Sequence, residues 1–177
     1  MRILTICLAI GMAALMGCTS TPKAPDVAAQ IRTALDQAGL KDVSQSQDRD
    51  KGVITLKGNV AVEADKARAE SIARTYAGAQ VVSNQIAVLP PGDESDAKRM
   101  NSDLDKGIES NLHAALIQQN LDSSVKYSVK NNVVTLTGDV DSQSRRGLAQ
   151  EVASRVPNVQ QVVNELQVKA QKATSSN

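Results

Sequence analysis

The sequence predicts an α+β protein made of two tandem αββαβ domains, each a mixed three-stranded sheet packed by two helices. Two observations carry this prediction. The segment Val53–Val60 is echoed by Val133–Val140, so that Val-Ile-Thr-Leu-Lys-Gly-Asn-Val becomes Val-Val-Thr-Leu-Thr-Gly-Asp-Val. Around these segments, the apolar residues change between helical and strand spacing in the same order in both halves of the chain.

The register between the two copies continues downstream without a gap. It pairs Ala69 with Ala149, Ala73 with Ala153, Val82 with Val162, Asn84 with Asn164, and Val88 with Val168. A match of this length indicates a duplicated domain. The copies share apolar, glycine and amide positions but no reactive side chain, so the repeat favours a binding or structural module over an enzyme.

The elements of the first copy, residues 26–89, follow from local signals. Asp26 is a good N-cap for a helix that runs to about Ala38, and Gly39 is a plausible C-cap. The remaining elements are a polar strand over 43–48, a second strand over 53–57, a helix with small residues on its inner face over 63–77, and a last strand over 81–89.

The second copy, residues 102–168, repeats this order after a linker at 90–101 that is predicted from its proline, glycine and charged residues. Asn131-Asn132 predicts a tight hairpin turn, because both residues tolerate positive φ. The other elements are predicted over 102–120, 125–129, 133–137, 144–155 and 159–168. The tail, 169–177, has no apolar period and is expected to be disordered.

These elements allow one economical arrangement. The first two strands of each copy form an antiparallel hairpin, and the third strand returns only after a helix. A mixed three-stranded sheet with both helices on one face satisfies that order.

The N-terminus predicts a lipoprotein signal peptide over residues 1–18. Arg2 precedes an apolar run that ends in Leu15-Met16-Gly17-Cys18, and this ending resembles the lipobox of bacterial lipoproteins. The resemblance implies that Cys18 carries the lipid, with 19–25 as a tether. Thr19 follows the cysteine where an Asp would suggest retention in the inner membrane, so outer-membrane sorting is expected. The alternatives are an ordinary secretory signal or an anchor helix.

The remaining composition excludes several classes of site. The cysteines, Cys7 and Cys18, leave no disulfide or thiolate metal site for either domain. The formal net charge of +1 gives no general attraction to nucleic acid. The lone His113 has no predicted catalytic partners, and the Asp-x-Asp strings that begin at Asp48, Asp103 and Asp139 lack the pattern of a calcium loop. We therefore expect no enzyme activity, no cofactor and no bound metal.

Three strings of both copies resemble the BON domain: Val-x-Leu-x-Gly-x-Val, Ala-x-x-(Ile/Val)-Ala and Val-x-Asn-x-(Ile/Leu)-x-Val. The first string begins at Ile54 in the first copy and at Val134 in the second. The three strings extend over 54–88 and 134–168. With the lipobox, the chain resembles the dual-BON-domain lipoproteins of the Gram-negative outer membrane. The resemblance implies the αββαβ fold, a lipid anchor facing the periplasm, and envelope maintenance by weak binding of anionic phospholipid or of outer-membrane proteins. Two alternatives stay open: a stress-response chaperone or scaffold that binds protein clients, and a sensor of a small solute.

Four basic residues of the second copy are candidates for phospholipid binding. Lys126 and Lys130 lie on its first strand, and Arg145 and Arg146 open its second helix. If they are grouped, they could contact phosphate head groups; the alternative is an ordinary solvated face. Two further pairs, Gly58 with Gly138 and Asn84 with Asn164, are interpreted as turn and backbone-capping residues rather than ligand contacts.

Overall fold

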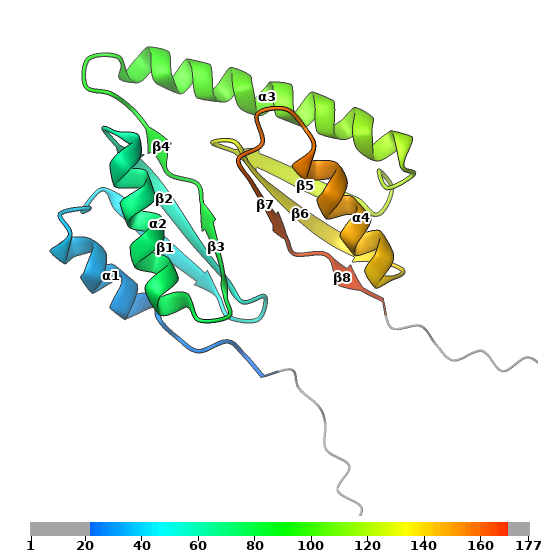
Figure 1. Ribbon diagram of the computed structural model, residues 1–177, viewed down its shortest axis with the longest axis horizontal. Coiled ribbons are helices and arrows are strands. Elements are labelled where there is room, and N and C mark those ends of the chain that lie inside the picture. Colours follow the sequence, from blue (N-terminus) through cyan, green and yellow to red (C-terminus); the bar gives the residue numbers. More distant parts are fainter. Residues whose placement is uncertain (1–21, 170–177) are drawn as a thin grey trace, which may run out of the picture.

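The computed structural model describes residues 22–169 and contains two domains of the predicted order (Figure 1). The elements are α1 (Ala28–Gln37), β1 (Val43–Asp48), β2 (Val53–Val60), α2 (Glu63–Ala77), β3 (Val81–Asn84) and β4 (Ala87–Val88), then α3 (Glu94–Gln118), β5 (Val125–Lys130), β6 (Val133–Val140), α4 (Gln143–Ser154), β7 (Gln161–Asn164) and β8 (Gln167–Val168). The predicted signal peptide with Cys18, the start of the tether and nearly all of the predicted tail lie outside the described residues. Within 22–169, no helix combines the length and apolarity needed to span a bilayer.

Both sheets are mixed, as predicted. β1 pairs antiparallel with β2, and β5 pairs antiparallel with β6. β3 and β7 then run parallel to the middle strands β2 and β6. Side chains from both helices and one face of the sheet form a single core cluster in each domain. The predicted α+β fold of two tandem domains is confirmed.

The third strand of each sheet is split into two short pieces, whereas the sequence predicted one continuous strand. β4 pairs with the end of β2, and β8 pairs with the end of β6. At each break an asparagine side chain bonds to nearby backbone: Asn84 Oδ1 accepts the Ile86 N–H at 3.4 Å, and Asn164 Oδ1 accepts the Leu166 N–H at 3.2 Å. This local hydrogen bond competes with the regular strand ladder and explains the interruption.

The two hairpin turns differ in length. In the first domain, Asp48 ends β1 and its carboxylate accepts the N–H groups of Asp50 and Lys51 at 3.1 and 3.0 Å. In the second domain, Asn131 and Asn132 make the turn alone, with φ of 48° and 65°. The predicted two-residue turn is confirmed, because both residues occupy the left-handed region.

The helix expected to begin at about Ser102 begins instead at Glu94. Most of the predicted linker, 90–101, is therefore helical. The spacing of apolar residues did not predict this helix start, because residues 94–100 extend beyond the second core and six of these seven are exposed. Acidic residues favour this helix start, and backbone N–H groups of Glu94 itself and of Gly92 lower the pKa of the Glu94 carboxyl.

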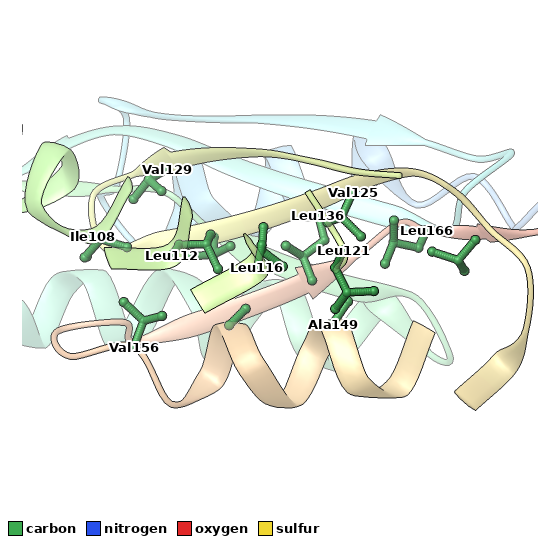
Figure 2. Packing of buried hydrophobic residues seen from close by; sticks show 13 residues of the cluster. Ile108, Leu112, Leu116, Leu121, Val125, Val129, Leu136, Ala149, Val156 and Leu166 are labelled. Carbon is green, nitrogen blue, oxygen red and sulfur yellow. The ribbon is translucent and has the colours of Figure 1, made fainter. Parts of the chain in front are cut away.

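The cores are aliphatic and their helices lie close to the sheets. Figure 2 shows the second core, in which Leu112 and Leu116 of α3 lie near Leu136 of β6 and Ala149 of α4. The four alanines at the predicted inner faces of α2 and α4 are fully buried, with 0% exposure for Ala69, Ala73, Ala149 and Ala153, whereas Tyr76, also predicted on the inner face of α2, is 40% exposed. The small size of the alanines allows each helix to approach the sheet closely.

Candidate functional site

The predicted lysines lie on the face of the second sheet that carries no helix. Val125 and Val129 of β5 point into the core and are buried, so the alternating residues Lys126 and Lys130 point to the opposite face, where both are exposed. Within residues 22–169, neither lysine forms an ion pair. Their positive charge is therefore free to meet an anion.

The predicted arginines lie elsewhere, at the start of α4 on the helix-covered face. Ser142 caps this helix by accepting the Arg145 N–H at 3.2 Å. The Arg145 guanidinium donates to the Asn120 carbonyl at 2.7 Å, and that of Arg146 donates to the Asn164 carbonyl at 3.2 Å. Both arginines are half-buried. The structure thus separates the two arginines from the two lysines, and it gives the arginines partners within the fold.

Glycine and asparagine pairs shared by the copies have matching conformational roles. Gly58 and Gly138 have φ of 117° and 118°. A side chain on Gly58 would overlap the carbonyl oxygen of Asp42, so the close approach of two backbones requires glycine there. Asn84 Nδ2 donates to the Lys66 carbonyl at 3.3 Å, and Asn164 Nδ2 donates to the Arg146 carbonyl at 3.1 Å. These bonds connect each third strand to the helix above it.

The other candidate groups have structural surroundings. His113 is exposed on α3. Asp48 caps the first hairpin, and Asp105 accepts backbone N–H groups of the second hairpin. Among residues 22–169, no group of three or more His, Cys, Asp or Glu side chains is placed to hold a metal ion.

The two domains meet along the edge strands β3 and β7, with the repeated residues in equivalent places. Val53 and Val133 form a small buried cluster with Val163, separate from both domain cores. Ser83, the repeat partner of Val163, is also buried, with 1% exposure. The junction therefore has approximate two-fold symmetry between the copies and a small apolar centre.

One glutamine closes the exposed edge of β3. The Gln161 side chain donates through Nε2 to the Val82 carbonyl at 2.6 Å and accepts the Asn84 N–H through Oε1 at 3.0 Å. It thus satisfies two backbone groups that an edge strand would otherwise leave open. Val81, the repeat partner of Gln161, is 46% exposed and has no amide to offer in return.

Polar contacts at the hairpin tips also join the domains. Lys51 Nζ lies 2.6 Å from a carboxylate oxygen of Glu165. Asn131, the repeat partner of Lys51, donates through its side-chain amide to the Gln85 carbonyl at 2.7 Å. The hydrogen bond to Glu165 raises the pKa of Lys51. Sequence reasoning missed these residues. The sequence signal that could have indicated them is a difference between the copies: Lys51 aligns with Asn131, and Val81 aligns with Gln161.

Comparison with known proteins agrees with the duplicated fold. The BON domain family matches residues 23–90 and 104–170. Osmotically-inducible protein Y of Escherichia coli is 30% identical over 146 residues, which cover 81% of this chain and 71% of that protein.

Solved structures of CdsD, a structural protein of the type III secretion system of Chlamydia trachomatis, are more distant. One is 16% identical, with a TM-score of 0.31 over 80% of this chain and 60% of that chain. A structure of the CdsD C-terminal domain is 17% identical, with a TM-score of 0.31 over 77% of this chain and 62% of that chain. In both cases the chain spans less than two thirds of the solved chain. Similarity this weak supports no conclusion about the domain arrangement or the role of this protein. The two matched regions, in contrast, cover most of the chain, which belongs to the BON domain family.

Proposed function

We propose that this protein is a lipoprotein of the outer membrane, facing the periplasm, whose second BON domain binds anionic phospholipid weakly. The observation that carries the proposal is the pair Lys126 and Lys130, exposed on the open sheet face and free of ion pairs within the described chain. The hairpin registers place Ser44 and Asp48 at the equivalent positions of the first domain. Neither of these two first-domain positions carries a positive charge, although Lys57 of β2 lies opposite Ser44.

The proposed anchor explains why weak binding is sufficient. Acyl chains on Cys18 would contribute about 0.8 kcal/mol for each buried CH₂ group, so several chains give lasting attachment. A domain attached to the same surface meets its lipid at high local concentration. Two exposed lysines, at about 1 kcal/mol each near an anionic surface, then suit the task.

The test of lipid binding uses residues 19–177, which contain both cores and lack the apolar N-terminal run. Sedimentation with phosphatidylglycerol vesicles should fall several-fold in the double variant Lys126→Glu with Lys130→Glu. The loss should shrink as salt is added, because screening weakens exposed charges. The matched control, Lys41→Glu with Arg68→Glu at exposed positions of the first domain, should bind as the wild type does. Equal losses in both variants, or no binding by the wild type, would contradict the proposal.

The anchor has its own test. The full chain with Cys18→Ser should lose the mass added by acylation and leave the outer-membrane fraction. An unchanged mass and unchanged fractionation would show that Cys18 is not the attachment point. The lipid-binding test above does not depend on this result, since it omits the anchor.

A second candidate is a stress-response scaffold that binds protein clients. The name of the Escherichia coli relative says that osmotic conditions induce it, which supports a stress role. Met100, 65% exposed, lines a groove of about 510 Å³ along α3 with the half-buried Leu104. Under this alternative, Met100→Ser should weaken suppression of client aggregation, whereas Met100→Leu should preserve it. If both variants and the wild type leave aggregation unchanged, the scaffold function fails.

A further inference from the structure

A cleft of about 710 Å³ lies between the domains, at the end of the junction nearest α3. One wall is the end of β2 with β4, the second is the first half of α3, and the third is the β5–β6 hairpin. Figure 1 shows α3 extending from the first domain across the second, above this region. The volume falls in the range of ordinary small-molecule sites.

One chain of hydrogen bonds fixes the three walls relative to one another. Asp105 of α3 is buried, and its carboxylate accepts the N–H groups of Asn131 and Asn132 at 2.9 and 2.8 Å. The Asn131 side chain in turn donates to the Gln85 carbonyl of the first domain at 2.7 Å. The hairpin is thereby held between α3 and the first domain. A cleft whose walls are already fixed loses little conformational entropy when a ligand binds.

The cleft carries a surplus of positive charge. Its ionisable lining consists of four lysines and two acids: Lys57, Lys98, Lys106, Lys130, Asp105 and Glu109. Asp105 is already engaged with backbone N–H groups, and Lys106 lies 3.4 Å from Asp103. The other three lysines have no ion pair within residues 22–169. In a chain with a net charge of only +1, this local excess attracts anions.

The uncharged lining adds hydrogen-bonding groups to the lysines. Amide and hydroxyl side chains, among them Asn59, Asn101 and Ser102, alternate with the lysines, and the lining includes no aromatic residue. Such groups exchange hydrogen bonds with hydroxyls, whereas ammonium groups bind phosphate as point charges. We propose that this cleft binds a water-soluble phosphorylated sugar, its phosphate groups on the lysines and its hydroxyls on the amides.

The repeat explains why the site occurs at one end of the junction. α1 has 10 residues and α3 has 25, so only the second copy supplies a helix long enough to form this wall. The strand position of Lys57 is Thr137 in the second copy. Lys130 belongs both to the cleft and to the open sheet face, whereas Lys126 lies outside the cleft, so variants of Lys126 separate this proposal from lipid binding by that face.

Calorimetric titration of the full-length protein tests the proposal, with fructose 1,6-bisphosphate as the probe and fructose as its uncharged counterpart. The bisphosphate should bind saturably at one site, and fructose should not. Lys57→Thr and Lys98→Gln should each weaken binding at least five-fold, whereas Lys126→Gln should leave it unchanged. Absence of saturable binding, or an equal loss in Lys126→Gln, would overturn the proposal.

A phosphatidylglycerol head group presents the same chemistry, a phosphate ester beside hydroxyls, so a second experiment separates the sources. The titration is repeated with vesicles of phosphatidylglycerol or of phosphatidylcholine, both of which would hold any anchored chain alike. Equal bisphosphate affinity with either vesicle supports a soluble ligand. Weaker affinity only with phosphatidylglycerol would assign the cleft to the head group and overturn the proposal. The proposed lipid function fails separately, if the Lys126 and Lys130 variants keep wild-type vesicle binding.

Discussion

The two domains carry equivalent cores on the same fold, yet their surfaces have diverged at the places where they meet. Ala69 and Ala73 in α2 are as deeply buried as Ala149 and Ala153 in α4. At the junction, in contrast, Gln161 of the second copy forms hydrogen bonds to β3, and its repeat partner Val81 in the first copy has no side-chain group that could do so. Core positions are constrained by packing within each copy, whereas junction positions must complement a different neighbour.

The same comparison separates the helices that open the domains. α1 has 10 residues and α3 has 25, although both contribute buried residues to similar cores. The additional turns of α3 line the cleft between the domains and contribute no residue to the second core cluster. A duplicated domain thus acquired a new surface through an extension that its own core does not require.

The largest expected effect tests what the copies share. Gly58→Ala should lower the free energy of unfolding by about 3 kcal/mol, because positive φ and overlap with Asp42 act together. Gly138→Ala should cost less, since its new Cβ would lie 2.5 Å from the Ser124 carbonyl oxygen, a milder overlap. Urea denaturation measures both.

Gly107→Ala is the matched control for these glycine variants. Gly107 lies inside α3 and has open space where a Cβ would stand, so alanine should stabilise the helix by about 0.5–1 kcal/mol. If all three variants have the same stability, the two positive-φ sites are not constrained as the structure implies.

The next effect tests whether the cores are equally tight. Ala73→Leu and Ala153→Leu should each destabilise the protein by about 1–3 kcal/mol, because a larger side chain cannot fit between helix and sheet. The exposed Ala64 of α2 offers a control, and Ala64→Leu should leave the melting temperature nearly unchanged. A core variant that melts with the wild type would show that its helix does not pack closely.

The fold could be predicted because its signals are local or repeated. Gly39 and the Asn131-Asn132 turn adopt the positive φ that their sequence suggests, and the apolar periods locate the helices and strands. The start of α3 could not be found in this way, since residues 94–100 carry no core-facing period. The break after Asn84 was also missed, because it depends on a side-chain bond to Ile86 that periodicity does not register.

The candidate site could be predicted only in part. Alternation along β5 correctly suggests that Lys126 and Lys130 share a face. Arg145 and Arg146 are near them in sequence, yet they lie on the opposite layer, where they bond to backbone carbonyls. The contacts between the domains could not be predicted, because a single sequence does not show which sheet edges meet. Long-range contacts such as that of Gln161 with β3 follow only from the domain arrangement.

A smaller effect tests the asymmetry of the junction. Gln161→Ala removes both hydrogen bonds to β3 and should cost about 1 kcal/mol. The amide of Asn84 should then exchange its hydrogen faster, because its acceptor is lost. Val81→Ala, at the equivalent place in the first copy, should leave that exchange rate unchanged. If exchange at Asn84 is the same in both variants, the glutamine does not protect the edge of β3.

The smallest effect tests the ion pair of Lys51 with Glu165 against the uncharged contact of Asn131, the repeat partner of Lys51. Lys51 is 42% exposed, so Lys51→Met should cost at most about 1 kcal/mol, and the loss should shrink with added salt. Asn131→Gly keeps the positive φ of the turn but removes the bond to Gln85, and its cost should not depend on salt. Because the hydrogen bond to Glu165 raises the pKa of Lys51, the contribution of the lysine charge is complete at neutral pH and is lost as the pH rises above the ordinary lysine range. Unfolding at low and high salt measures both variants, and parallel salt dependence would show that Lys51 contributes through packing rather than charge.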